Sequence, residues 1–600
     1  SCTQVLPKPD GTSETITISS TYDSMGRKIK ELDSRGYQTI NTYDAFGRVT
    51  ATTYKYSESD TLKQSTSTSY DANNMITYEK LADGTEKWYT YDDMYRVTST
   101  RVKKGGSEET ITTTYGYEDV DIYQGKGTNT VAVNNAYVTT QSYSDGTIIS
   151  KTYEDHKGNL VRVYSGGLYT DMTYNSQGDM ITKWVMGKTL SATDGVLQLF
   201  IHDDKGNLTQ TITDPDYIAG TETTGYKVRE DSTTEDGVAI QGSIVTKSTY
   251  DSDGNVTSTT DAEGNTTAYT YDRLGNLTSV LQPDNVKYEY QYEVQGTNGT
   301  TKDIVLEPRV TGIDAGRSMS KSVVTKDATD KVIKVEDFGT SDTDDTSIST
   351  SYEYDVRDNL IKSIEKNGNY KLYTYDSRDR VTSFDYYEVS GDTAVKTLRT
   401  EFTYDDSDNI TSMTDKEVAT DGTETIYRYT AYGYDGFNRL IYVSECDTDA
   451  VPTEAEIDAN KVIYGYDIKD RMVSIDYPDS HEGITGLEFN YDSNSWLQNV
   501  TAVKDDGSTS LLRTYTYDNY GRTSEIKDYP DTINGTSKWI KRVFTYDKLD
   551  RTTGIEYYDN LSGNSTDIKA SYYYTYDKNG NITSEEYLNI YGEDNGTYYG

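Results

Sequence analysis

Residues 269–279 read YTYDRLGNLTS, and variants of this stretch recur along the whole 600-residue chain. Copies of its Tyr-Asp motif begin at fifteen tyrosines, namely Tyr22, Tyr43, Tyr70, Tyr91, Tyr250, Tyr271, Tyr354, Tyr375, Tyr404, Tyr434, Tyr466, Tyr491, Tyr517, Tyr546 and Tyr576. A period of about 20–50 residues is typical of repeat architectures. A catalytic residue is rarely needed so many times, so the motif predicts a structural unit.

The fourth residue after each Tyr indicates a turn. It is Gly in six copies, Asp in five and Asn in two, and only Tyr95 and Ser495 depart from this rule. Gly, Asn and Asp are the residues that best tolerate a positive φ angle. We therefore expect a three-residue hairpin loop, formed by a type I turn and a bulge, that closes on a left-handed residue at position four.

This loop fixes which residues face each other across the hairpin. Position one should pair with position five, which is Arg in eight copies and Asn in five, and the Tyr should pair with position six, which is apolar in twelve. In the opening stretch Asp272 then faces Asn276, and Tyr271 packs against Leu277. Each such cross-strand pair contributes roughly 0.2–1 kcal/mol.

In each pair of copies that lie 21 residues apart, a second glycine stands seven residues before the second Tyr, and it predicts an alternate turn. These glycines are Gly36, Gly84, Gly167, Gly264 and Gly368. Each repeat is then two strands and two turns, and the chain is an antiparallel array of hairpins. Degenerate copies begin at Tyr153, Tyr174 and His202.

The residues expected to build the repeat are Tyr22, Asp23, Gly26, Tyr43, Asp44, Gly47, Tyr91, Asp92, Tyr250, Asp251, Gly254, Tyr271, Asp272, Gly275, Tyr375, Asp376, Tyr517, Asp518, Gly521, Tyr576, Asp577 and Gly580.

The composition supports an all-β protein. The chain holds 59 Tyr but only 8 Phe and 4 Trp, and Tyr and Thr favour strands. With 58 basic and 99 acidic residues its formal charge is −41, which argues against nucleic-acid binding. No apolar run approaches the roughly 18–20 residues of a membrane span. Cys2 and Cys446 could form one bridge or remain two thiols.

No constellation of residues indicates catalysis, a metal site or a cofactor. The stretches DSDGN (251–255) and DKNGN (577–581) resemble calcium loops, but the full EF-hand spacing is missing, and we interpret them as turns. The three His residues have no metal-ligand spacing beyond what the repeat supplies. A glycosidase with paired carboxylates stays open, because a sequence does not give distances.

Stretches such as YDSDGNVTSTTDAEGNTTAYTYDRLGNLT (250–278) resemble the YD repeats of Rhs proteins, bacterial wall-associated YD proteins, teneurins and the B and C subunits of Tc toxins. The resemblance is strong over 1–100, 250–280 and 351–600. It implies a spiral β-sheet that forms a hollow shell or barrel. In toxin members the shell encloses a C-terminal toxic domain, and in teneurins it is an extracellular adhesion scaffold.

The resemblance leads to specific expectations for this chain. We expect a non-enzymatic shell segment of a secreted or cell-surface bacterial protein, whose partner is a C-terminal effector domain of its own longer chain. The alternative is an adhesin that binds surface glycans or proteins. The only Asp-Pro, at 214–215, lacks the context of the family's proteolytic core.

The array divides into four parts according to how closely the repeats in each part match the Tyr-Asp motif. Residues 1–103 hold YD repeats, 104–249 degenerate ones, 250–350 YD repeats with an irregular insertion, and 351–600 YD repeats with longer rim loops, all in one continuous array cut from a longer chain. The rim loops are expected at 385–400 and 445–462, with one short helix within 447–461.

Overall fold

The computed structural model describes residues 2–599 of the chain. It leaves out 8–12, 34–37, 56–63, 82–83, 105–106, 125–129, 192–194, 214–215, 218–225, 228–231, 234–238, 241–242, 296–299, 311–320, 328, 339–346, 356–357, 377, 406, 436, 468, 534–535, 561–567 and 590–595. Gly36 and the Asp-Pro pair at 214–215 lie outside the described residues.

The elements of the first half are β1 (Cys2–Pro7), β2 (Ser13–Tyr22), β3 (Lys28–Asp33), β4 (Gln38–Tyr43), β5 (Val49–Lys55), β6 (Gln64–Tyr70), β7 (Ile76–Lys80), β8 (Glu86–Tyr91), β9 (Val97–Lys104), β10 (Ser107–Tyr123), β11 (Thr130–Tyr143), β12 (Ile148–Glu154), β13 (Leu160–Ser165), β14 (Leu168–Tyr174), β15 (Met180–Val185), β16 (Val196–His202), β17 (Leu208–Thr213), β18 (Asp216–Tyr217), β19 (Tyr226–Lys227), β20 (Ser232–Thr233), β21 (Ala239–Ile240), β22 (Ile244–Tyr250), β23 (Val256–Thr260), β24 (Thr266–Tyr271), β25 (Leu277–Leu281) and β26 (Val286–Gln295).

The elements of the second half are β27 (Thr301–Val310), β28 (Lys321–Lys326), β29 (Val332–Phe338), β30 (Ser347–Tyr354), β31 (Leu360–Ile364), β32 (Tyr370–Tyr375), β33 (Val381–Ser390), β34 (Thr393–Tyr404), β35 (Ile410–Val418), β36 (Glu424–Tyr434), β37 (Leu440–Cys446), α1 (Glu454–Ala459), β38 (Lys461–Tyr466), β39 (Met472–His481), β40 (Ile484–Tyr491), β41 (Leu497–Lys504), β42 (Thr509–Tyr517), β43 (Thr523–Ile533), β44 (Thr536–Tyr546), β45 (Thr552–Asp559), β46 (Ala570–Tyr576), β47 (Ile582–Asn589) and β48 (Gly596–Tyr599).

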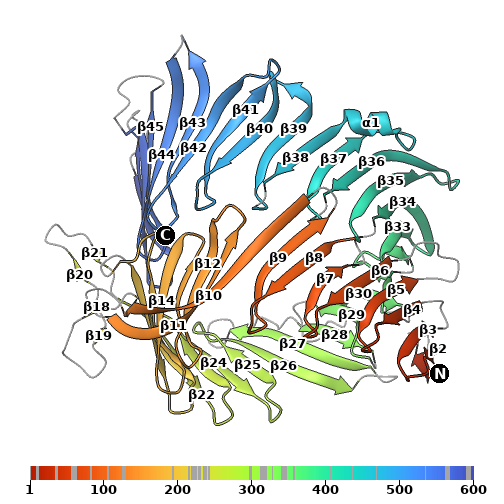
Figure 1. Ribbon diagram of the computed structural model, residues 1–600, viewed down its shortest axis with the longest axis horizontal. Helices are drawn as coiled ribbons and strands as arrows, with labels where there is room; N and C mark the ends of the chain where they lie inside the picture. The colour runs from red at the N-terminus through yellow and green to blue at the C-terminus, as the bar shows by residue number, and fades with distance from the viewer. Residues whose placement is uncertain are drawn as a thin grey trace. The chain divides into compact units, whose positions relative to one another are not determined.

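The expected all-β hairpin array is confirmed. Among the described residues, 44 strands belong to one hydrogen-bonded sheet (Figure 1). Wherever a register is given within it, each strand pairs antiparallel with its neighbour in sequence, except that β17 pairs with β22. The four short strands β18 to β21 form two separate hairpins. The expected short helix within 447–461 is confirmed as α1, which Thr453 caps.

The sheet divides into two compact units. The first consists of Ser1–Ile111, Val286–Arg471 and Ile475–Asp479, and the second of Thr112–Asn285, Met472–Ser474 and Ser480–Gly600. Each unit therefore combines an early and a late part of the array.

The predicted left-handed residue at position four is confirmed. Its φ angle is positive in all fifteen copies, including the two that lack Gly, Asn or Asp, where φ is +62° at Tyr95 and +67° at Ser495. The turn geometry therefore overrides the residue preference in these two copies. The alternate-turn glycines Gly84, Gly167, Gly264 and Gly368 also have positive φ.

The strand register agrees with the predicted pairing and adds one irregularity. Tyr271 lies opposite Leu277 as expected, and Asp272 N donates to Asn276 O. The next pair, however, is Thr270 with Ser279, so position seven is an extra residue in its strand. Such a bulge increases the local twist of the hairpin.

Two expectations are wrong in detail. In the degenerate copy assigned to Tyr153, Glu154 pairs with Leu160 and occupies the position of the motif Tyr, one residue later than expected. Residues 385–400 are not a rim loop, because β33 and β34 extend through them and meet at a tight turn. The added residues there lengthen a hairpin, since longer strands satisfy their own backbone groups.

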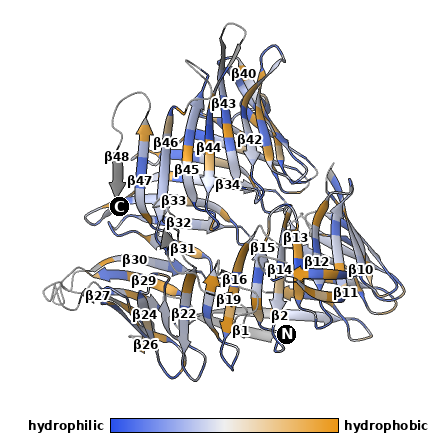
Figure 2. Ribbon diagram, turned by 90° about the vertical axis from the view of Figure 1, so that its left-hand side faces the viewer, coloured by the Kyte–Doolittle hydropathy of each residue, from blue (hydrophilic) through white to orange (hydrophobic). Residues whose placement is uncertain are grey.

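The hydrophobic core is small and local. Figure 2 shows hydrophobic residues in short segments along the strands. Both clusters of buried apolar side chains among the described residues lie in the second unit. One consists of Ile122, Ala136, Val138, Tyr153 and Val161, and the other of Trp184, Met186, Leu197, Leu199 and Ile212.

Candidate functional site

The motif Asp organises each Tyr-Asp turn from inside. Its Oδ1 accepts the backbone N–H of position five in all fifteen copies, at 2.8–3.1 Å. In the opening stretch Asp272 Oδ1 also accepts the N–H of Leu274, and Oδ2 accepts the Asn276 amide at 3.0 Å. The carboxylate therefore replaces the backbone partners that the turn residues lack.

Arginine at position five connects one turn to the next. Arg27 Nε donates to Asp23 within its own turn, while its Nη1 donates to the Asp44 carbonyl of the following turn at 3.1 Å. Its guanidinium also lies 4.7 Å from the Tyr43 ring centroid. The same pair of contacts to the next turn recurs from Arg48, Arg380, Arg439, Arg522 and Arg551.

The tyrosine hydroxyl completes this connection. Tyr43 Oη donates to the Lys28 carbonyl at 2.8 Å, and Lys28 is position six of the preceding copy. The same bond recurs from Tyr70, Tyr91, Tyr375, Tyr404, Tyr466, Tyr491, Tyr517, Tyr546 and Tyr576. We call this chain of Tyr, Asp and Arg contacts along the sheet edge the turn ladder.

Threonines just before the motif Tyr form a further row. Thr270 Oγ1 lies 2.9 Å from Thr278 Oγ1 and 2.7 Å from Ser279 Oγ. Equivalent groups occur at Thr249, Thr374, Thr403 and Thr575. These hydroxyls bridge the bulge in the hairpin, where the regular backbone ladder is interrupted.

The ladder carboxylates are poorly suited to proton transfer. The Asn276 amide and neighbouring N–H groups hold the pKa of Asp272 below its usual value of 3.8, and Arg96 does the same to the pKa of Asp92. A general acid needs a pKa near the working pH. The repeated Asp therefore acts as a fixed hydrogen-bond acceptor.

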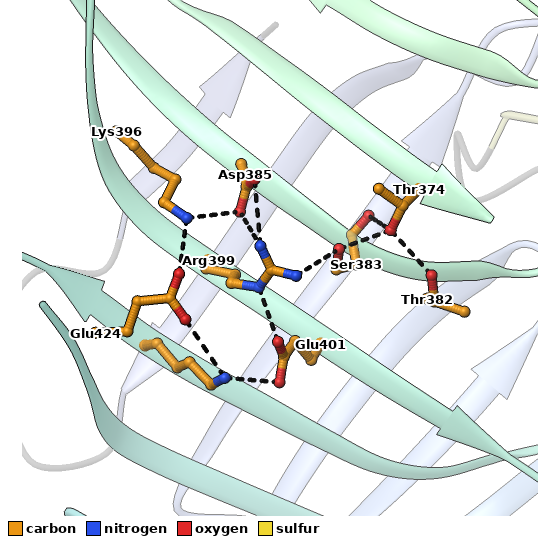
Figure 3. A network of polar contacts seen from close by, with 9 residues as sticks. Thr374, Thr382, Ser383, Asp385, Lys396, Arg399, Glu401 and Glu424 are labelled. Carbon is orange, nitrogen blue, oxygen red and sulfur yellow. Dashed lines mark hydrogen bonds and ion pairs between the residues drawn. The ribbon is translucent and has the colours of Figure 1, made fainter. Parts of the chain in front are cut away.

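A closed ring of alternating charges lies on strands β33 to β36 in the first unit (Figure 3). Lys396 Nζ contacts Asp385 at 3.5 Å and Glu424 at 2.7 Å. Arg399 contacts Asp385 at 3.1 Å and Glu401 at 2.8 Å. Lys416 joins Glu401 and Glu424, at 2.7 and 3.6 Å, and completes the ring. Three positive and three negative groups leave no net charge, so the ring ties four strands together.

A buried ion pair supports the degenerate repeats of the second unit. Arg162 and Asp171 face each other across β13 and β14, with contacts of 2.6 Å from Nε and Nη2, and their side chains are only 6% and 0% exposed. Asp171 also accepts the Tyr123 N–H, and Arg162 donates to the Asp121 carbonyl. The pair therefore holds the end of β10 against β13 and β14. Burial raises the pKa of Asp171, opposed by Arg162.

A cavity of about 200 Å³ lies beside this core. Its walls include Ile122, Val161 and Met172, and its polar rim includes Asp155 and His156. The Asp155 carboxylate is already engaged by the Asn159 amide and by two N–H groups of its own turn. The rim therefore repeats the structural turn and presents no free catalytic carboxylate.

The described part of the chain contains no group of three or more His, Cys, Asp or Glu residues that could hold a metal ion. His202 occupies the Tyr position of its degenerate turn and pairs with Leu208. Cys446 is a buried thiol outside any disulfide among the described residues. In the described part of the chain, no helix has both the length and the apolar character needed to cross a membrane.

In the second unit, alternate turns contact Tyr-Asp turns more than 300 residues away. The turn at 261–265 meets the turn at 577–581, where Asn579 Nδ2 donates to Asp261 at 2.8 Å and Lys578 N donates to Glu263 at 2.6 Å. These bonds join the β23–β24 connection to the β46–β47 connection.

Two further contacts of this kind involve buried glycines. Lys188 N donates to Asn519 O at 2.8 Å, and a Cβ added to the preceding Gly187 would lie 2.3 Å from that oxygen. A Cβ on Gly167 would lie 3.0 Å from Asn494 Oδ1. We call these three contacts the seam. At the seam the alternate-turn edge of the early strands is joined to the Tyr-Asp edge of the late strands.

Sequence reasoning missed the tyrosine hydroxyl bonds, the Arg contacts between turns, the charge ring and the seam. One signal for the hydroxyl was available, because the chain holds 59 Tyr against only 8 Phe. The ring and the seam depend on register and on contacts between distant strands, so no local pattern predicts them.

One comparison with known proteins supports this repeat. The model of the RHS Repeat family matches residues 250–296. No curated protein sequence matches the chain.

Among solved structures, the crystal structure of TcdB2-TccC3-Cdc42 aligns with 100% of this chain at 12% identity and a TM-score of 0.46. The Tc holotoxin pore of Photorhabdus luminescens aligns with 100% at 11% identity and a TM-score of 0.26. The chain spans 37% and 36% of those two chains. The chain therefore contains an RHS repeat at 250–296, and the turn geometry of that repeat recurs in fifteen copies from Tyr22 to Tyr576.

Proposed function

We propose that this chain is a non-enzymatic wall segment of a secreted or cell-surface bacterial YD-repeat protein. Its sheet forms a hollow shell that encloses or presents an effector domain at the C-terminal side of a longer chain. The repeat classes 1–103, 104–249, 250–350 and 351–600 form one continuous wall in this proposal. Its partner is the rest of its own polypeptide.

The observation that carries the proposal is the seam. At the seam, turns at opposite edges of the sheet meet through hydrogen bonds and buried glycines. A hairpin sheet whose turns join in this way can stack successive layers of strands into a wall.

The turn ladder supports a mechanical role for the wall. Each connecting Arg contacts its own Asp, the carbonyl of the next turn and the next Tyr ring. Because nearest neighbours are linked in this way, a local load is shared along the edge, as in other repeat proteins. The motif carboxylates are committed to these contacts, which supports a structural function.

The proposal can be tested with a fusion protein. A nuclease domain fused after Gly600 should degrade added nucleic acid slowly and resist protease while the wall is folded. Gly187→Val should open the seam and restore both activity and protease cleavage, because the added side chain collides with Asn519 O. Gly116→Val is the matched control, since an added Cβ there meets nothing within 4 Å.

Two results would contradict this function. Full nuclease activity in the unmutated fusion would show that the wall encloses nothing. Binding of the unfused chain to a glycan array, lost on substitution of residues in 445–462, would instead favour the adhesin alternative.

A further inference from the structure

The cavity of about 200 Å³ in the second unit takes no part in the turn ladder or the seam. It lies between the β10–β11 hairpin and strands β13 to β15: Ile122 and Val133 line it from the hairpin, and Val161, Met172 and Ile181 line it from the strands. Ile122, Val161 and Met172 are buried. A preformed cavity with apolar walls and a few polar groups at its rim is the usual form of a small-molecule site.

The buried ion pair holds the two walls of this cavity at a fixed distance. Arg162 on β13 and Asp171 on β14 bond to each other, and they also bond to the Asp121 carbonyl and the Tyr123 N–H, on either side of Ile122. The hairpin cannot close onto the strands without breaking these buried bonds. A ligand therefore enters a space that is already shaped, and binding costs little ordering of the protein.

Polar side chains that line the cavity are already paired within the protein. Tyr174 Oη donates to the Leu160 carbonyl at 2.8 Å, and the Thr173 and Thr182 hydroxyls lie 2.5 Å apart. At the rim, the Asp155 carboxylate accepts three bonds from its own turn. The part of a ligand that lies inside has to be apolar, because a polar group there would lose its bonds to water without replacement.

The volume sets the size of that apolar part. A cavity of about 150 Å³ with apolar walls holds one benzene molecule. The cavity here is somewhat larger, so it accommodates one aromatic ring with a short substituent. Met172 adds a thioether to the wall, and sulfur atoms make favourable contacts with aromatic rings.

The rim offers a positive charge to the substituent. Lys157 and His156 both line the cavity and are exposed. Lys157 Nζ donates to the Ser176 carbonyl at 3.3 Å, which uses one of the three N–H donors of an ammonium group. A carboxylate on the ligand would accept another of these donors in a charge-assisted bond. Since the chain carries a formal charge of −41, carboxylates are repelled by most of its surface, and binding of one indicates a specific contact.

We propose that this cavity binds a monocyclic aromatic carboxylate. The ring lies between Ile122, Val161 and Met172, and the carboxylate lies at Lys157 Nζ. The site is independent of the proposed wall function, because it uses neither the seam nor an enclosed effector.

The test is a ligand-observed NMR titration of the 600-residue chain with phenylacetate and with phenylacetamide, its neutral analogue of nearly the same shape. We expect saturable binding of both, about tenfold tighter for the carboxylate because of its charge-assisted bond. Lys157→Gln should weaken the binding of phenylacetate about tenfold, to the level of the amide, and should leave binding of the amide unchanged.

Lys205→Gln is the matched control. Lys205 is also the third residue of its turn and donates to the Ser252 carbonyl at 3.2 Å, but it does not line the cavity. This variant should bind both probes like the parent chain. Val133→Phe should fill the cavity and abolish binding of both probes, with circular dichroism to show that the sheet is retained. Lack of saturable binding, equal affinity for the two probes, an equal loss in Lys205→Gln, or binding that persists in a folded Val133→Phe variant would each overturn the proposal.

Discussion

The regular repeats of residues 351–600 and the degenerate repeats of residues 112–213 are held together by different forces. In the regular stretch most buried side chains are hydroxyl-bearing, among them Ser383, Thr400, Ser412, Thr430, Ser444 and Ser571. The degenerate stretch holds both buried apolar clusters and the Arg162–Asp171 pair. The regular repeats thus depend on hydrogen bonds that recur in every copy, whereas the degenerate ones depend on contacts that occur once.

This difference explains where the motif can be lost. The degenerate turns keep the hydrogen-bond geometry with other residues: Asn175 takes the place of the motif Asp and accepts the N–H groups of Gln177 and Asp179. Apolar packing against β10 and β11 supplies additional stability there. Where a local apolar core adds stability, the turns can therefore lose the Tyr-Asp motif. Hairpins without such a core depend on the motif itself.

The largest expected effect comes from breaking the buried pair. Asp171→Asn leaves Arg162 charged and without its partner in a buried site, which should cost about 3–5 kcal/mol. Urea unfolding combined with hydrogen exchange should locate the loss in 112–213. The double variant Arg162→Met with Asp171→Leu should recover most of it. A single variant that costs less than about 1 kcal/mol would refute the assigned role of the pair.

The next largest effect is the loss of stability when one leucine in each region is replaced by alanine. Leu197 is 2% exposed in a cluster with Trp184, so Leu197→Ala should cost about 2–4 kcal/mol. Leu277 is half-buried at position six of a regular repeat, and Leu277→Ala should cost only about 1 kcal/mol. The denaturation midpoints of the two variants give the comparison. Equal losses would mean that the regular repeats also depend on apolar burial.

A turn variant tests the backbone in the regular region. Gly275 has a φ of +85°, and an added Cβ would meet only Asn255 Oδ1 at 3.8 Å. The cost of Gly275→Val, about 1–2 kcal/mol, should therefore come from the left-handed conformation and not from a collision. Gly275→Asn should cost less, since Asn tolerates this conformation. Equal stability of the Val variant would disprove the turn assignment.

The motif carboxylate should contribute slightly less than the left-handed glycine. Asp435 accepts the N–H groups of Phe437 and Arg439 and the Arg439 Nε, with its side chain 14% exposed. Asp435→Ala should cost about 1 kcal/mol or somewhat more, as at a helix N-cap, because two N–H groups lose their acceptor. Asp435→Asn keeps an acceptor and should cost less. If both variants cost the same, the ion pair with Arg439 matters more than the turn.

The smallest expected effect per residue concerns acid, which should destabilise the regular repeats before the degenerate ones. In 351–600 burial acts to raise the pKa values of Asp376, Asp435 and Asp467, but bonds from the Arg side chain and N–H at position five outweigh it and lower them. The pKa of Asp577 is lowered first by its bond from the Asn581 side chain. Residues 112–213 hold fewer such carboxylates, at Asp155 and Asp203. The contribution of these carboxylates to stability is then complete above the unfolded value near 3.8 and is lost as pH falls through the folded values. Hydrogen exchange after exposure to pH 2–4, roughly this window, should show earlier loss of protection in 351–600 than in 112–213. The reverse order would contradict the comparison.

Much of the local structure follows from the sequence alone. The Gly, Asn and Asp at position four predict the left-handed turn, because few other residues adopt a positive φ without strain. Tyr95 and Ser495 adopt it too, since the Asp and the paired strands on either side determine the conformation. The Asp-to-Arg pairing within a turn also follows from spacing, because both residues lie in one loop.

Only the tertiary structure decided the long-range contacts. The position of Glu154 in place of Tyr153 depends on how β12 pairs with β13, and a degenerate motif leaves that register open by one residue. The seam between 261–265 and 577–581, and the bond from Lys188 to Asn519, join turns whose separation along the chain no repeat period specifies. Short-range hydrogen bonds repeat with the sequence and can be predicted from it. Contacts between distant strands depend on the accumulated twist and register of every hairpin between them.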